Sequence, residues 1–178
     1  DIPGAVYLQP VGFTANFTVP ERADRVAITY VDHSTFVLTT PGGLSVATDY
    51  TGHVGVPGFV PAVVTMNIAH DSHYTRFPDP AIAHVLEGWP GPDGQPREHH
   101  LDLGEMLIRN VTTDIRSRGG DRIFRHGNSI FVFEAAGLCI GHLGHLHHEP
   151  DARQYAGRRV SSGFRPQPCG PDTTRRCL

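Results

Sequence analysis

The apolar residues of this sequence are grouped in short runs that are separated by glycine, proline and polar residues. Residues 60–66 and 129–133 are rich in valine, isoleucine or phenylalanine, and each run has the length of a strand rather than of a long helix. Pro41-Gly42-Gly43 lies between two further runs, as the turn of a hairpin would. The pattern therefore predicts a β meander with few helices.

The dense valine content of residues 60–66 is typical of a strand that is buried on both faces. Asp79 followed by Pro80 is typical of a helix start, because it combines an N-cap residue with a proline at the first helical position. We therefore predict one short helix over residues 81–86, ended by Gly88. Strands are predicted at residues 26–31, 35–38, 44–48, 60–66, 106–111, 129–133 and 138–140.

The composition divides the chain into segments of different character. Residues 1–25 are interrupted by prolines and are expected to form an N-terminal arm. Residues 26–148 carry the predicted strands and are expected to form one folded domain. Residues 149–178 mix arginine with proline, glycine and serine, and their apolar periodicity is lost, so a poorly ordered tail is expected there.

The formal net charge of the chain is -3 with histidine neutral, and its basic residues are all arginine. This balance argues against nucleic acid or an anionic membrane as the main partner. The absence of lysine excludes Schiff-base chemistry and a P-loop phosphate site. The apolar runs are far shorter than a membrane span, so we expect a soluble protein, cytoplasmic, or secreted or periplasmic if Asp1 marks a processed end.

Two of the predicted strands open into loops that are rich in histidine. His70 and His73 follow the strand at 60–66, and residues 142–148 hold four further imidazoles after the strand at 138–140. Neutral imidazole is the commonest protein ligand for Zn²⁺ and suits several other first-row metals. We therefore expect the two loops to meet in one cleft and to hold a metal ion together.

Four segments between residues 26 and 148 resemble the metallo-β-lactamase fold superfamily, specifically its branch of lactonase-like hydrolases. Residues 30–36 are similar to the Gly-His-Ala/Ser-Thr/Ser-Phe segment of that branch, and Ala47-Thr48-Asp49 to its strand that ends in aspartate. Residues 69–74 and 139–145 are similar to its histidine loops, in the same order along the chain. The resemblance implies an α+β fold: a metallo-β-lactamase-like β-sandwich with few helices, here a partial αββα fold that lacks the C-terminal half.

The first metal-binding motif of that family is His-x-His-x-Asp-His. Aligned on His73, the motif retains His70 but places Ile68 and Ser72 at its other histidine and at its aspartate. In the later motif, His145 stands where the family has its bridging aspartate. The resemblance therefore implies one Zn ion rather than two, with Mn or Fe as alternatives. The expected ligands are His70, His73 and His145, or His142 in place of one of these.

Three protein ligands plus a water form the open arrangement of a catalytic zinc, which suits the hydrolysis of an ester or lactone. Asp71 or Asp114 is expected to accept the proton. His33 is expected to act as a gatekeeper or outer donor, and Asp32 or Asp49 to fix the tautomers of the ligands. The function implied is that of a metal-dependent hydrolase acting on a small ester, lactone or related substrate.

Other interpretations stay open at this point. The chain is alternatively a divergent or truncated, non-catalytic member of the fold that binds a metal or small ligand, or a homo-oligomer in which a second chain completes the site. A serine-hydrolase triad at Ser34 is disfavoured, because no nucleophile elbow surrounds that residue. Asn128 and Ser129 are expected to close a turn, and His99 and His100 to lie on the surface.

Overall fold

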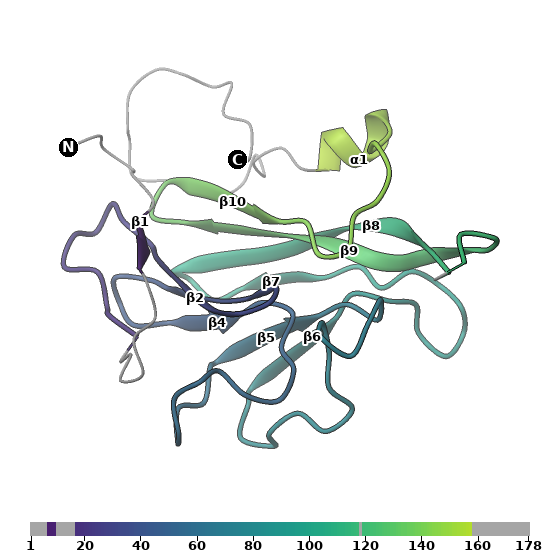
Figure 1. Cartoon of the computed structure of the whole chain (residues 1–178). Coiled ribbons are helices and arrows are strands. Elements are labelled where there is room, and N and C mark those ends of the chain that lie inside the picture. Colours follow the sequence, from purple (N-terminus) through teal and green to yellow (C-terminus); the bar gives the residue numbers. More distant parts are fainter. Residues whose placement is uncertain (1–6, 10–16, 118, 158–178) are drawn as a thin grey trace.

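The computed structural model describes residues 7–9, 17–117 and 119–157, and its two β-sheets are stacked as layers (Figure 1). Most of the arm predicted at 1–25, and the part of the predicted tail beyond Gly157, lie outside these residues. In the described part of the chain, no helix is long and apolar enough to cross a membrane.

The first sheet mixes parallel and antiparallel neighbours. Across the sheet, its described strands are β1 (Tyr7–Gln9), β2 (Ala27–Asp32), β3 (Thr35–Thr39), β4 (Ser45–Ala47), β5 (Val63–Met66) and β6 (His84–Glu87). β2, β3 and β4 are antiparallel neighbours, whereas β4, β5 and β6 run parallel to one another. The carboxyl ends of β4 and β5 therefore meet at the same edge of the sheet, which brings the residues that follow these strands together.

The second sheet is antiparallel throughout. Across this sheet, its described strands are β10 (Leu138–His142), β9 (Ile123–Ala135), β8 (Met106–Arg116) and β7 (His100–Asp102). The short helix α1 (Ala152–Gly157) packs beside β8 on the side away from the first sheet (Figure 1). The Arg109 guanidinium on β8 donates a hydrogen bond to the carbonyl of Gly157, which ties the helix to the sheet.

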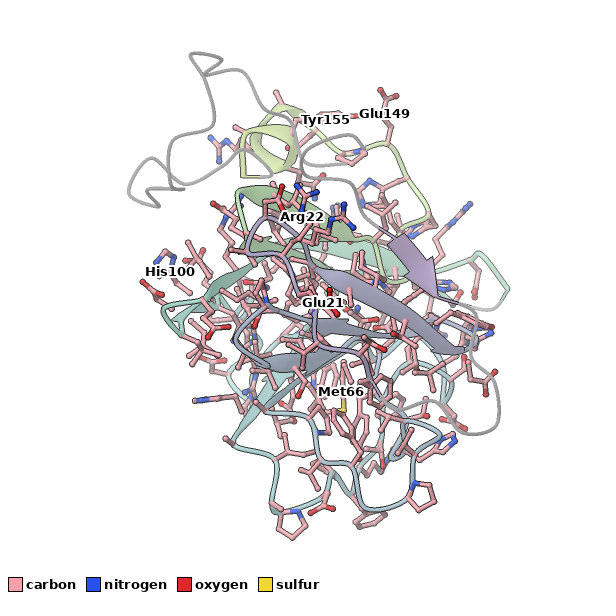
Figure 2. All side chains as sticks on the ribbon, turned by 90° about the vertical axis from the view of Figure 1, so that its left-hand side faces the viewer. Glu21, Arg22, Met66, His100, Glu149 and Tyr155 are labelled. Atoms are coloured by element: carbon pink, nitrogen blue, oxygen red, sulfur yellow. The ribbon has the colours of Figure 1, made fainter. Side chains whose placement is uncertain are left out.

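The main core lies between the sheets, because alternate residues of each strand face the other layer. Ile108 and Phe133 of the second sheet are both 0% exposed and pack with Val46 and Val63 of the first sheet. A second cluster forms on the outer face of the first sheet, around Met66, and is covered by loops rather than by helices (Figure 2). The architecture is thus a β-sandwich with little helix, and the predicted α+β class is confirmed.

The core between the sheets is expected to determine the stability of the fold, and a substitution that opens a small cavity in it tests this. Ile108→Val removes one methylene from a side chain that is 0% exposed. The free energy of unfolding is expected to fall by about 0.5–1.5 kcal/mol in urea titrations. Ile123→Val makes the same change at a side chain that is 58% exposed and is the control. Equal losses in both variants would contradict this assignment of the core.

The strands predicted from the apolar runs are confirmed by β2 to β5 and by β8 to β10. The helix predicted over residues 81–86 is wrong, because β6 begins at His84 and pairs in parallel with β5. Asp79 does cap a turn, since its carboxylate accepts a hydrogen bond from the Ala81 N–H at 2.8 Å. After this turn, the chain gains more stability from pairing with the buried strand β5 than it would from a short helix over the same residues.

Candidate metal centre

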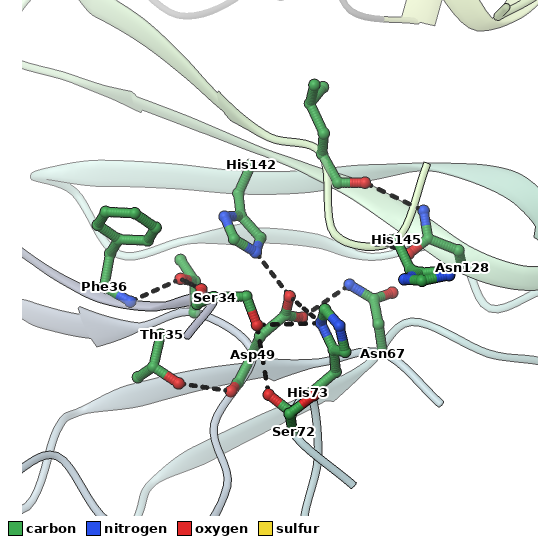
Figure 3. Close-up of polar contacts among 12 residues, drawn as sticks. Ser34, Thr35, Phe36, Asp49, Asn67, Ser72, His73, Asn128, His142 and His145 are labelled. Carbon is green, nitrogen blue, oxygen red and sulfur yellow. Dashed lines mark hydrogen bonds and ion pairs between the residues drawn. The ribbon is translucent and has the colours of Figure 1, made fainter. Parts of the chain in front are cut away.

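The candidate site is built around Asp49, two residues beyond the end of β4. This aspartate is 0% exposed and has a φ of 41°, and the Thr35 hydroxyl donates a hydrogen bond to its carbonyl at 2.8 Å. Oδ2 of the carboxylate lies 2.7 Å from Nδ1 of His73 and 2.8 Å from Nε2 of His142 (Figure 3). Oδ1 accepts a hydrogen bond from the Asn67 amide at 2.9 Å. One buried carboxylate, placed just beyond β4, thus joins residues that follow β5 to the last residue of β10.

The Asp49 carboxylate is charged at neutral pH although it is buried. Burial by itself would raise its pKa, but the hydrogen bonds from His142 and His73, together with the positive charge these imidazoles carry when protonated, lower the pKa to about 2. The site therefore contains a fixed negative charge beneath its imidazoles. An anion in this position favours cationic groups or ions above it.

His73 is the most constrained imidazole next to this carboxylate. His73 is 4% exposed, and its backbone closes a turn in which the His73 N–H donates to the His70 carbonyl at 2.9 Å. Nδ1 is used by Asp49 and also lies 3.1 Å from Oγ of Ser34. This leaves Nε2, on the other side of the ring, as the nitrogen that can meet a ligand or an ion. A carboxylate that holds one nitrogen of an imidazole whose other nitrogen binds metal is the usual arrangement in metalloproteins.

Three imidazoles from the two predicted loops lie together, and we call His70, His73 and His145 the imidazole cluster. Their ring centroids are 6.0 Å apart for His70 and His73, 5.5 Å for His73 and His145, and 4.6 Å for His70 and His145. Three imidazoles bound to one zinc at about 2.0–2.1 Å place their ring centres about 5 Å apart. The spacing of the cluster therefore fits one ion.

The imidazole rings are not oriented to coordinate an ion as they stand. Among the described residues, no three or more His, Cys, Asp or Glu side chains are arranged to hold a metal ion as they stand. The contacts of 2.7 and 2.8 Å around Asp49 are hydrogen bonds. Two atoms bound to the same tetrahedral zinc ion lie about 3.3 Å apart. The Asp49 oxygen and these imidazole nitrogens are therefore too close together to have a cation between them. Donor types and spacing fit a metal ion, and its binding requires rotation of imidazole rings such as that of His70, which is exposed.

The surroundings of His145 favour the neutral form of its imidazole. Burial lowers the pKa of this imidazole, and the neighbouring His70, His73 and His147 lower it further, whereas Asp49 acts in the opposite direction. The neutral form is the one that can bind a metal ion. His145 is also fixed by its backbone, because its N–H donates to the Asn128 side chain at 2.8 Å.

The remaining predicted site residues fall into different surroundings. His33 is exposed, has a φ of 46° and packs edge-on against His73, with ring centroids 5.4 Å apart. Asp71 is exposed on the loop between His70 and His73. His142 is held by Asp49 rather than turned toward the cluster.

Asp114 lies on β8 and is engaged in other contacts. Its carboxylate accepts hydrogen bonds from Arg125 at 2.6 Å and from the His126 N–H at 3.0 Å. Burial alone would raise its pKa, but these hydrogen bonds lower it. The Asp114 N–H donates to Nε2 of His148 at 3.3 Å, so the residue sits beside the end of the second histidine loop.

Ser34, His73 and Asp49 do come together, but not as a catalytic triad. A triad needs the serine on one nitrogen of the imidazole and the carboxylate on the other. Here both groups contact Nδ1 of His73. The arrangement cannot relay a proton from Ser34 through the ring to Asp49.

Sequence reasoning missed Asn67 and underestimated Asn128, both of which are 0% exposed and hydrogen-bonded at the site. The available signal was the position of Asn67 directly after a buried strand. His99, expected on the surface, is half-buried and structural, because its Nε2–H donates to the Glu87 carbonyl at 2.8 Å and its ring stacks on Phe131.

Comparison with protein-family models agrees with this fold. A family model described as a beta-lactamase superfamily domain matches residues 27–159. A chain from Thermotoga maritima, assigned as a Zn-dependent hydrolase of the metallo-beta-lactamase superfamily, is 24% identical with a TM-score of 0.45, and the match covers 73% of this chain and 55% of that one. A chain from Parabacteroides distasonis, assigned as a metal-dependent hydrolase, is 15% identical with a TM-score of 0.48, with coverages of 67% and 60%. This chain therefore spans little more than half the length of either structure. No curated protein matches it.

Proposed function

We infer that this chain, which belongs to the beta-lactamase superfamily, is a metal-dependent hydrolase acting on a small ester, lactone or related substrate. The observation that supports this most is the convergence of His70 and His73 with His145, from two separate loops, at centroid distances of 4.6 to 6.0 Å. The buried anion of Asp49 directly behind His73 supports it further.

His70, His73 and His145 would hold one ion, and zinc suits three imidazoles best, with Mn or Fe as alternatives. A zinc ion so held polarises a carbonyl and lowers the pKa of a water toward about 7. In this proposal His142 is a partner of Asp49 rather than a ligand, because its Nε2 already lies 2.8 Å from Oδ2.

The protein residues would orient the reactants and accept a proton. Asp49 holds the proton of His73 on Nδ1, which leaves the Nε2 lone pair free for binding. Asp71 is the better candidate for a proton acceptor, because it is exposed beside the cluster, whereas Asp114 is engaged by Arg125. His33 is exposed next to His73 and can donate a hydrogen bond to a bound substrate.

A non-catalytic member of the fold is the second candidate. Ile68 and Ser72 occupy positions at which the family motif has ligands, and this favours loss of a two-metal site. Elemental analysis of purified protein separates the candidates. One equivalent of zinc together with ester or lactone hydrolysis supports the enzyme. Stable folding with no bound metal and no hydrolysis would support the second candidate.

A single substitution in the cluster tests the proposed hydrolase. Zinc-free protein is expected to regain hydrolysis of an activated aryl ester when zinc is added, and His70→Ala is expected to abolish this recovery. His100→Ala is the matched control, because His100 is an exposed imidazole at the periphery of the molecule (Figure 2). Full turnover by zinc-free protein, or by zinc-loaded His70→Ala, would reject the mechanism.

A further inference from the structure

We propose that Asn67 and Asn128 are positioning residues that fix the two histidine loops of the imidazole cluster against each other. Both side chains are fully buried, although asparagine is a residue that folded proteins usually expose. Each is hydrogen-bonded at both ends of its amide. A buried amide with all its partners in place specifies one arrangement, because any other leaves polar groups unsatisfied.

Asn67 joins the two sheets at the site. Its Nδ2 donates to Oδ1 of Asp49 at 2.9 Å, and its Oδ1 accepts a hydrogen bond from the Ser129 N–H on β9 at 2.7 Å. A reversed amide would place its oxygen against the carboxylate, so the two partners allow one orientation. With Oδ1 of Asp49 occupied by Asn67, Oδ2 is the oxygen that faces Nδ1 of His73 and Nε2 of His142.

This contact has a chemical consequence for His73. A carboxylate that accepts a hydrogen bond from Nδ1 keeps the proton on that nitrogen and the lone pair on Nε2. The Asn67 side chain is hydrogen-bonded to Asp49 rather than to His73, and it acts by fixing the rotation of the Asp49 carboxylate. We therefore expect the tautomer of His73 to depend on Asn67 even when no metal is present.

Asn128 supports the other loop. Its Oδ1 accepts a hydrogen bond from the His145 N–H at 2.8 Å, and its Nδ2 donates to the Leu143 carbonyl at 3.2 Å and to the Thr113 hydroxyl at 2.8 Å. Gly144 lies between the two held residues with a φ of +59°, and a Cβ at this position would collide with the side-chain amides of both Asn67 and Asn128. The second histidine loop therefore packs directly against the side chains of the two asparagines.

This inference rests on the proposed function in one respect only, that the imidazole cluster is the working site. The arrangement of the cluster is measured in metal-free protein. A failure of the wild type to bind zinc would therefore reject the proposed function but would leave the test of the asparagines valid. The structural role and the metal role are measured separately.

The first experiment compares Asn67→Ala with Asn110→Ala. Asn110 is a matched control, because its side chain also bridges Ser129, at 2.9 Å to the hydroxyl, but does not touch Asp49. Long-range ¹H–¹⁵N spectra of metal-free, ¹⁵N-labelled protein report the tautomer of His73. We expect the Nδ1-protonated form in the wild type and in Asn110→Ala, and a mixture of tautomers in Asn67→Ala. Zinc affinity should fall about 10–100-fold in Asn67→Ala, the usual cost of losing an outer partner. A folded Asn67→Ala with an unchanged tautomer would overturn the proposal.

The second experiment uses Gly144→Ala, which leaves both asparagines in place and so does not depend on whether Asn67→Ala folds. Gly104→Ala is its control, because Gly104 has a φ of +78° with no atom within 4 Å of the added Cβ. Both variants carry the same kind of backbone strain. We expect Gly144→Ala to lose the nuclear Overhauser contact between the His70 and His145 rings and to bind zinc about 10-fold or more weaker. Retention of that contact and of zinc affinity in Gly144→Ala would overturn the proposal.

Discussion

Replacement of His73 with alanine is expected to abolish zinc-dependent hydrolysis. It should also weaken zinc binding by more than the roughly 10–100-fold that loss of an outer hydrogen-bonding partner costs. His73 is 4% exposed, and it alone links the cluster to the Asp49 carboxylate at 2.7 Å among the described contacts. Its loss removes a proposed ligand and leaves the buried anion without one of its donors. Competition titration with a zinc chelator and an ester assay measure the two effects.

The control for this variant must remove another imidazole that is packed and hydrogen-bonded within the fold. His99 is suitable, because its ring stacks on Phe131 and its Nε2–H donates to the Glu87 carbonyl at 2.8 Å. His99→Ala is expected to lose stability but to keep zinc affinity and hydrolysis. If both variants lose zinc affinity to the same extent, the effect of His73→Ala is one of stability, and His73 is not a ligand.

Asp49→Ala is expected to have the largest effect on stability, a decrease in the free energy of unfolding of about 3–5 kcal/mol. The carboxylate is 0% exposed and accepts hydrogen bonds from His73, His142 and Asn67. Removal of the acceptor deprives these donors of their carboxylate partner, at about 1–3 kcal/mol for each buried group left unsatisfied, and relief of the burial of one charge offsets part of this cost.

Urea unfolding in the presence of a metal chelator measures this effect without a contribution from bound zinc. Asp32→Ala is the control, since Asp32 is an exposed aspartate at the end of β2. That variant should stay within about 0.5 kcal/mol of the wild type, as surface substitutions usually do. A similarly small change in Asp49→Ala would show that the carboxylate does not hold the site together.

The convergence of the histidine loops was predictable because each loop follows an apolar run of strand length. His73 follows β5 in the first sheet, and His145 follows β10 in the second. Whether two such strand ends share an edge depends on how the sheets are stacked, and the periodicity of a single strand carries no information on stacking. That the two loops meet was thus an expectation from the strand ends, and the order of the histidine loops along the chain, which is that of the family, was its further support.

The roles within the site were less accessible from sequence. His142 and His145 are three residues apart and look equivalent, yet one contacts Asp49 and the other lies against His70. Asn67 reads as an ordinary loop residue, because its importance arises from a hydrogen bond to Ser129 on the opposite sheet. β6 was mistaken for a helix for a related reason: the cap at Asp79 is local, whereas the strand pairing is not.

Anomalous diffraction at the zinc absorption edge, from crystals grown with one equivalent of zinc, shows whether His70, His73 and His145 share one ion. A single peak within about 2.0–2.1 Å of a ring nitrogen of each of the three residues is the expected result. The absence of a peak at the cluster, or a peak at the adjacent His147 and His148 instead, would contradict it.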